Sequence, residues 1–150
     1  MDKPGETPQE LIDTVRSRVD HILRDVYPEY ISFDNGAFAI TRGSTQVMIV
    51  VRPFTEEDCV VECIAQVVQG ATITPELMKF LLRKNAELHL GGFGLLFDDT
   101  VVFTHALTGT NMDRNELIAA VASTAIISDY YDDEIVAMAG GKRASDILEL

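Results

Sequence analysis

The chain has 150 residues, of which 47% are hydrophobic, and its 24 acidic and 12 basic residues give a formal net charge of −12. A chain of this length has room for a single hydrophobic core. The negative charge repels phosphate backbones and anionic lipid, so we expect no nucleic-acid partner and no membrane partner. No apolar run approaches the ~20 residues of a membrane span, and the N-terminus lacks the apolar core of a signal peptide. We therefore expect a cytoplasmic protein.

The N-terminal region predicts a short tail followed by a helix. Residues 1–6 are polar and include a proline and a glycine, so we expect a flexible tail. The motif TPQE begins at Thr7 and has the threonine, proline and glutamate spacing of a capping box, which predicts a helix start. Apolar residues then recur at helical spacing until Pro28, whose ring cannot continue a helix. They are Leu11, Ile12, Val15, Val19, Ile22, Leu23 and Val26.

The pattern changes to that of β-strands after the motif DNG at residues 34–36, a strong turn signal. We expect three strands joined by tight turns, in residues 37–42, 45–54 and 59–68. The second strand is apolar on both faces, with Val47, Ile49 and Val51 on one and Met48 and Val50 on the other. Because a strand wet on one side alternates more cleanly, either a helix or another protein is expected to cover the second face.

The two cysteines, Cys59 and Cys63, lie an even number of positions apart in the third strand. Their side chains therefore point to the same face, too far apart along one strand to form a disulfide. A metal site needs further ligands, but the chain has no other cysteine and its three histidines are scattered. We expect buried, reduced thiols, no metal site and no cofactor.

A second helix is predicted at the motif TPEL, where Thr74 is the cap and a proline follows it. This helix is apolar around much of its circumference, which predicts that it is sandwiched between other elements. Its apolar residues are Leu77, Met78, Phe80, Leu81 and Leu82. We expect it to end near Asn85, a residue type that tolerates the left-handed conformation at helix ends.

The segment NAELHLGGFGLLF holds the glycines Gly91, Gly92 and Gly94, which invite comparison with a phosphate-binding loop. Such a loop needs its glycines between a strand and the helix that follows, whereas here the helix comes first and a strand is expected from residue 88 to 97. Glycine inside a strand instead indicates close approach of another backbone. The approaching group is a helix of the same subunit, a second subunit or a bound peptide.

After the glycine-rich strand, TVVFTHAL predicts its partner in a hairpin, and the capping box formed by Asp113 and Glu116 predicts a third helix that extends toward Gly140. The element order is α-β-β-β-α-β-β-α. Hairpins dominate this order, which predicts an α+β fold with an antiparallel sheet, a single domain over residues 7–139 and a C-terminal tail over residues 140–150.

Catalytic signals are weak. His89 and His105 are expected on the two strands of the glycine-bearing hairpin, yet neither has a carboxylate or hydroxyl partner in its motif. The acidic cluster DYYDDE, residues 129–134, lacks the glycine and alternating spacing of a calcium loop, so a solvated helix face is expected. We expect no catalytic residues. The alternative is a small-molecule-binding domain or an enzyme with a pocket near the two histidines.

Several motifs together resemble the YbjN-like family, also labelled bacterial sensory transduction regulators. They are RGSTQVMIVVRPF, TPELMKFLLRKNAELHLGGFGLLFDD, VVFTHALTG, MDRNELIAAV and GGKRASD, and they span nearly the whole chain. That family is related in fold to type III secretion chaperones, small acidic proteins that are commonly dimers and hold extended segments of client polypeptides. The resemblance implies a bacterial binding protein without cofactor or active-site residues.

The expected function is that of a non-enzymatic, chaperone-like or regulatory adaptor in the cytoplasm that binds protein or peptide segments as a homodimer. The client is expected to pack against Met48 and Val50, or along the strand of Phe93 and Leu95, while acidic residues select basic flanks. The C-terminal SDILEL is either a docking peptide for a partner or a segment packed on its own domain.

Overall fold

A computed structural model describes residues 6–43 and 45–148 of the chain. Most of the expected N-terminal tail, residues 1–5, lies outside this part. The helices are α1 (Gln9–Val26), α2 (Pro75–Glu87), α3 (Arg114–Ala139) and α4 (Ala144–Leu148). The strands are β1 (Ile31–Ser32), β2 (Phe38–Arg42), β3 (Thr45–Pro53), β4 (Cys59–Gln69), β5 (Gly92–Leu95), β6 (Val101–Thr108) and β7 (Lys142–Arg143).

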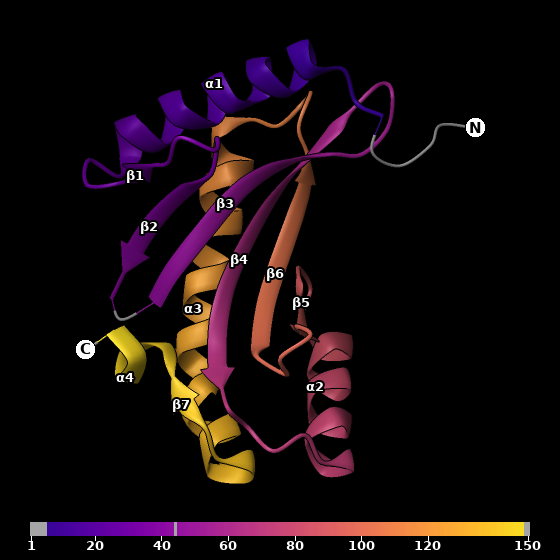
Figure 1. Cartoon of the computed structure of the whole chain (residues 1–150), viewed down its shortest axis with the longest axis vertical. Helices are drawn as coiled ribbons and strands as arrows, with labels where there is room; N and C mark the ends of the chain where they lie inside the picture. The colour runs from indigo at the N-terminus through magenta and orange to yellow at the C-terminus, as the bar shows by residue number, and fades with distance from the viewer. Residues whose placement is uncertain (1–5, 44, 149–150) are drawn as a thin grey trace.

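The strands form one antiparallel sheet in the order β1-β2-β3-β4-β6-β5, with β7 paired to the end of β4 (Figure 1). The α+β class, the antiparallel pairing and the predicted order of the main elements are confirmed. The short elements β1, β7 and α4 add to that order. Helix α3 also continues through the acidic cluster to Ala139, where Gly140 ends it with a positive φ of 73°.

One side of the sheet, the helix face, is covered by α1, α2 and α3. Its central strands contribute Val47, Ile49, Val51, Cys59, Val61 and Cys63, which are all buried. Helix α1 crosses one end of the sheet and packs its apolar stripe there, and the first half of α3 completes this cluster. Figure 1 shows α3 running along the back of the sheet from one end to the other.

A second cluster of buried residues joins α2, β5, β6 and the second half of α3. Leu77 and Leu81 of α2 pack toward Phe93 and Phe103. The Phe93 ring lies edge-on to Phe103, with centroids 5.2 Å apart. Since α3 takes part in both clusters, it links the two ends of the core.

The predicted capping box at Thr7 is wrong, whereas the other two predicted caps are confirmed. Helix α1 begins at Gln9 without a side-chain cap. The Thr7 hydroxyl instead donates to the carbonyl oxygen of Thr55 (2.6 Å) and accepts from the Phe54 N–H (2.7 Å), so it ties the N-terminal region to the β3–β4 turn. Thr74 caps α2, and the first turn of α3 has its complete capping box.

Two expectations for α2 are also wrong. The helix is not sandwiched: Leu77 and Leu81 are buried, but Met78 and Leu82 remain exposed, the latter by 69%. The helix also continues past Asn85 to Glu87, because the Asn85 side chain is used for a contact with β5 and not for ending the helix. The glycine-bearing strand is shorter than expected and covers Gly92–Leu95, not residues 88–97.

Candidate functional site

The side of the sheet opposite the helix face, which we call the open face, carries Met48, Val50, Val60, Glu62, Ile64, Val102, Thr104 and Ala106. Strand pairing places Met48 opposite Ile64, and Ile64 opposite Thr104, so a row of two aliphatic residues and one threonine, which we call the apolar row, crosses β3, β4 and β6. Met48, Val50 and Ile64 are half-buried, in contrast to their fully buried neighbours on the helix face. β-branched and aliphatic side chains on an accessible strand surface favour binding of another apolar segment.

Charges on the open face are few and paired. The Arg52 Nε lies 3.2 Å from the Glu62 carboxylate across β3 and β4, and Val50 is the residue directly opposite Glu62. The apolar row therefore has one ion pair at its side. This arrangement suits an amphipathic segment, whose apolar side chains meet the row and whose polar groups meet the pair.

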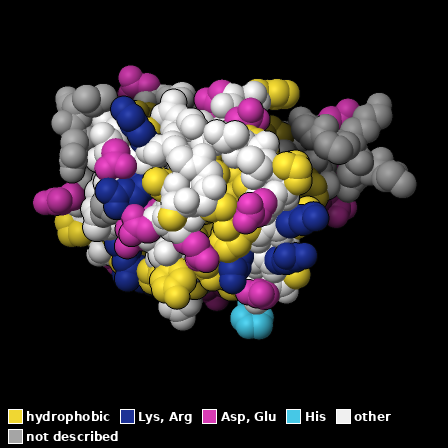
Figure 2. Space-filling model, turned by 90° about the horizontal axis from the view of Figure 1, so that it is seen from below, with side chains coloured by type: hydrophobic (Ala, Val, Ile, Leu, Met, Phe, Trp, Pro, Cys, Tyr) yellow, Lys and Arg dark blue, Asp and Glu magenta, His cyan; other side chains and the backbone are white. Residues whose placement is uncertain are grey.

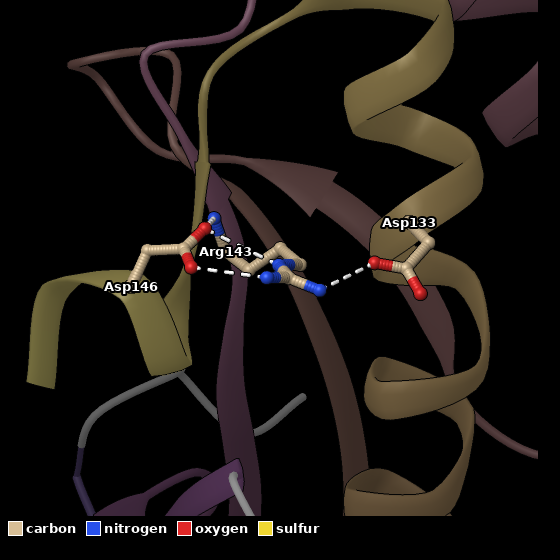
Figure 3. Close-up of polar contacts among 3 residues, drawn as sticks. All are labelled: Asp133, Arg143 and Asp146. Atoms are coloured by element: carbon tan, nitrogen blue, oxygen red, sulfur yellow. Dashed lines mark hydrogen bonds and ion pairs between the residues drawn. The ribbon is translucent and has the colours of Figure 1, made fainter. Parts of the chain in front are cut away.

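The C-terminal segment, residues 140–148, lies against one part of the open face. Ala144 and Ile147 of α4 line a cavity of about 190 Å³ together with Met48, Ile64 and Val102. Of the two interpretations of the tail, the structure shows packing on its own domain. Strand β7 carries Arg143, whose guanidinium reaches carboxylates on both α3 and α4 (Figure 3).

The free edge of β2 forms a second concave region. Strand β1 pairs only with Phe38 and Ala39, and the described part of the chain places no strand beside Ile40 and Thr41 on that side. A cavity of about 410 Å³ lies there, lined by Val26, Tyr27, Pro28, Glu29, Tyr30, Ile40 and Thr41. Burial raises the pKa of the Tyr27 hydroxyl. An unpaired strand edge beside a cavity of mixed polar and apolar lining is a place where an extended peptide can add to the sheet.

A group of exposed apolar side chains, the α2 patch, lies at the opposite edge of the sheet. It consists of Met78, Leu82, Leu90, Leu95, Leu96 and Phe97. Met78, Leu82 and Asn85 share one side of α2, and Asn85 bonds to β5, so this side is the one next to the edge strand. Phe97, in the β5–β6 turn, is fully exposed.

The three predicted structural glycines meet groups of the same chain. Gly91 has a φ of +77°, and a Cβ there would lie 2.6 Å from the Thr104 carbonyl oxygen. A Cβ on Gly92 would meet the Asn85 side chain at 3.4 Å, and one on Gly94 would meet Val102 at 3.8 Å. The close approach that glycine indicated thus comes from β6 and α2 of this subunit, and it is tightest at Gly91.

Asn85 of α2 binds the edge strand β5, a role that the sequence interpretation missed. Its amide accepts from the Phe93 N–H at 2.7 Å and donates to the Phe93 carbonyl oxygen at 3.1 Å. The side chain thereby occupies the outer backbone groups of the edge strand as a neighbouring strand would. The sequence did hold a signal for this contact, because Asn85 is a polar amide within a helix rich in apolar residues.

The sequence-predicted partner residues have different environments. Met48 and Val50 lie on the open face, and Leu95 is 40% exposed in the α2 patch. Phe93 is only 8% exposed because its ring packs between Phe103 and Tyr131. Direct contact of the Phe93 ring with a partner does not fit this burial.

The two histidines are not brought together. His89 lies in the exposed connection between α2 and β5, so its expected place on a strand is wrong. His105 is buried on the helix face, where its Nδ1 lies 3.3 Å from the Ser123 hydroxyl and burial lowers its pKa. Neither histidine lines any of the cavities described above.

The cysteines and the acidic cluster show no arrangement for chemistry. Cys59 and Cys63 are free and buried, and burial raises the pKa of Cys63 to about 12, which disfavours the reactive thiolate. Within residues 6–43 and 45–148, no group of three or more His, Cys, Asp or Glu side chains is arranged to hold a metal ion. The helices of the same residues include none with the length and hydrophobicity to cross a membrane.

Solved structures with a similar fold include chains of three protein complexes. A chain of the ExsC–ExsE complex superposes with a TM-score of 0.63 at 15% identity, over 80% of this chain and 95% of that one. A chain of the HopA1–SchA chaperone–effector complex gives 0.62 at 9% identity, over 81% and 97%. The structure of the Yersinia pestis type III secretion chaperone SycH with a fragment of YscM2 gives 0.53 at 19% identity, over 77% and 98%. At these identities the likeness concerns the fold.

No curated protein matches the sequence. A family comparison does match, and it covers residues 10–147, from the first turn of α1 into α4. The match includes the strands of the open face and the glycine-bearing hairpin, and it confirms the resemblance to YbjN-like proteins. The chain belongs to the family described as T3SS (YopN, CesT) and YbjN peptide-binding chaperone 1.

Proposed function

We propose that this protein is a non-enzymatic chaperone or adaptor of the bacterial cytoplasm that holds a segment of a client polypeptide on its open face. The observation that carries the proposal is the apolar row across β3, β4 and β6, which the helices of the core leave accessible. Membership of a peptide-binding family and the likeness of the fold to chaperone–effector complexes support it.

Binding works through burial of alternate side chains of the client. An extended client exposes every second side chain to the same surface, which matches the spacing of Met48 and Val50 along β3. Each aliphatic client side chain that becomes fully buried contributes about 1.5–3 kcal/mol. Two or three such contacts, about 3–9 kcal/mol together, are comparable to the cost of association, so polar contacts of the client must add to them.

Charge selects the client. The formal charge of −12 favours clients whose apolar segment is flanked by lysine or arginine, and it speeds their encounter at low salt. The surface is not uniformly acidic: at the end formed by α2 and the last turns of α3, acidic, basic and hydrophobic side chains alternate (Figure 2). An acidic preference at this end therefore comes from the net charge of the molecule and not from a local acidic patch.

The homodimer, in this proposal, forms through the α2 patch. A monomer seldom leaves this many large apolar side chains together at a sheet edge unless they meet a partner. The Asn85 amide already occupies the backbone groups of Phe93, so two subunits meet through Leu82, Leu95 and Phe97 and not through strand pairing. In a symmetric contact of this kind the same residues of both subunits meet.

The test is affinity purification of the full chain followed by mass spectrometry of the bound polypeptides. A Val50→Asp chain places a charge on the open face directly beside the apolar row and should lose the client. An Ile126→Asp chain is the matched control, because Ile126 is an exposed aliphatic residue on α3, away from the open face. Equal recovery of the same polypeptide by both variants would exclude the open face as the binding surface.

A further inference from the structure

The C-terminal segment, residues 140–148, turns back onto the sheet through two consecutive glycines. Gly140 and Gly141 have φ values of +73° and +92°, a conformation that favours glycine. A Cβ on Gly141 would lie 2.7 Å from the Gln69 carbonyl oxygen and 2.8 Å from the Ala71 nitrogen. The sequence therefore encodes a tight reversal at the end of α3, which directs β7 and α4 back along β4.

Ion pairs hold the segment in place. The Arg143 Nη1 lies 2.7 Å from the Asp133 carboxylate on α3, and its Nη2 lies 3.1 Å from the Asp146 carboxylate on α4 (Figure 3). Asp146 also accepts from the Arg143 backbone N–H at 3.1 Å. The Arg143 and Asp146 side chains are 39% and 37% exposed and Asp133 is 75% exposed, so water and salt screen these contacts.

The segment covers the open face incompletely. Ile147 and Ala144 lie over Met48 and Ile64, but the cavity of about 190 Å³ between them is not filled by side chains. This hollow is partly open to solvent, so apolar side chains along it, such as Met48, Ile64 and Ile147, remain in contact with water. A segment with a larger apolar residue at this place would therefore fit the open face better than α4 does.

Residues 140–148 can also detach from the sheet without disturbing the core. Helix α4 has five residues, too few to be stable on its own, and β7 pairs with only Val68 and Gln69 of β4. The two buried clusters of the core include no residue of β7 or α4. Release of residues 140–148 would expose Met48 and Ile64 while α1, α2 and α3 stay packed.

We propose that residues 140–148 are an internal competitor that occupies part of the client surface and is displaced when a client binds. This inference rests on the proposed peptide-binding function and adds its regulation. It also gives the client a chemical requirement: one large aliphatic or aromatic side chain that enters the cavity above Met48 and Ile64 in place of Ile147. The segment keeps Met48 and Ile64 partly covered when no client is present.

The direct test uses a fluorescent peptide that copies residues 140–148, GGKRASDIL, with blocked termini. The full chain carrying Ile147→Asp cannot seat its own segment, so the peptide should bind this chain at least about tenfold more tightly than it binds the wild-type chain. Peptide carrying aspartate in place of the isoleucine should bind neither chain, and an Ile126→Asp chain should behave as wild type. Equal binding of the native peptide to wild-type and Ile147→Asp chains, or no binding to either, overturns the proposal.

A second measurement reports, without any peptide, whether residues 140–148 cover Met48. We call this covering of the open face closure. In a Met48→Cys chain, the rate of maleimide labelling at that cysteine should rise severalfold when Arg143→Ala releases the segment. The native Cys59 and Cys63 are buried and label slowly. Arg114→Ala, which removes the exposed pair with Asp25 (2.7 Å), is the matched control. An unchanged rate in the Arg143→Ala chain contradicts closure by the segment.

The two proposals can fail separately. If client capture fails in every chain while labelling behaves as expected, the proposed function is rejected and the closure by residues 140–148 is retained.

Discussion

The two faces of strand β3 differ sharply although their residues alternate along the same backbone. Val47, Ile49 and Val51 are fully buried beneath α1 and α3, whereas Met48 and Val50 on the open face are half-buried. Similar aliphatic residues therefore serve two purposes: one set stabilises the fold, and the other is available to a partner. The hydrophobicity of a residue does not show which of the two purposes it serves. The position of the helices decides this, because they cover only one face of the sheet.

The largest expected effect tests the helix face. Ile49→Ala removes a fully buried side chain between two helices and should reduce the free energy of unfolding by about 2–5 kcal/mol. Met48→Ala, at the adjacent position, should cost clearly less, because Met48 is half-buried. Urea unfolding of both variants measures the difference. Equal losses would remove the distinction between the faces.

A second variant tests how closely the backbone of β6 approaches Gly91, the residue just before β5. Gly91→Ala places a Cβ 2.6 Å from the Thr104 carbonyl oxygen at a positive φ, and should cost more than the ~1–3 kcal/mol typical of backbone strain alone. Gly43→Ala has a positive φ of 62° but no atom within 4 Å of its Cβ, so it measures the strain alone. If the two variants unfold at the same urea concentration, the close approach is unimportant.

The α2 patch extends the comparison to a third surface. Leu82→Asp changes a residue that is 69% exposed, so the free energy of unfolding of the subunit should change by less than about 0.5 kcal/mol. The mass from light scattering should nevertheless fall from dimer to monomer, because a charge would be buried in the contact. A dimer that survives this change, and also Phe97→Asp, would place the subunit contact elsewhere.

The smallest effect concerns His105 on the helix face. Burial lowers its pKa below the ordinary value of 6.5, so the unfolded chain binds a proton at a higher pH than the folded chain does. Stability from this residue is complete above pH 6.5 and is lost as the pH falls through that value. Asp58, Asp98 and Asp146 have lowered pKa values, so the stability that they contribute is lost only when the pH falls below their ordinary value of 3.8. Asp132 has a raised pKa, so its contribution to stability rises as the pH falls.

The measurement for this effect is urea unfolding at pH 7 and pH 5.5. The wild-type chain should lose stability between the two values, and a His105→Asn chain should lose less. A variant with the same pH dependence as the wild type would show that burial of His105 is not the cause.

Local rules predicted the parts of the fold that local interactions determine. The caps at Thr74 and Asp113 act within one helical turn, and the alternation along β3 follows from the strand itself, so all three were visible in the sequence. Thr7 and Asn85 were misjudged because contacts distant in the sequence use their side chains: the β3–β4 turn in one case and the β5 edge in the other.

The candidate site was harder to predict because apolar periodicity does not say what covers an apolar face. Met78 and Leu82 have the same helical pattern as buried residues, yet the core leaves them exposed. The closure by the C-terminal segment depends on Arg143 meeting Asp133 and Asp146 from two different helices, a juxtaposition that exists only in the folded chain.

The central claim, that a client lies on the open face, is tested most directly by site-specific photo-crosslinking in bacterial cells. A photoreactive phenylalanine derivative replaces Val50 on the open face or, as a control, Ile126 on the opposite side of the molecule. We predict a crosslink to a specific polypeptide from position 50 and none to that polypeptide from position 126. A crosslink to the same polypeptide from position 126 alone would contradict the claim.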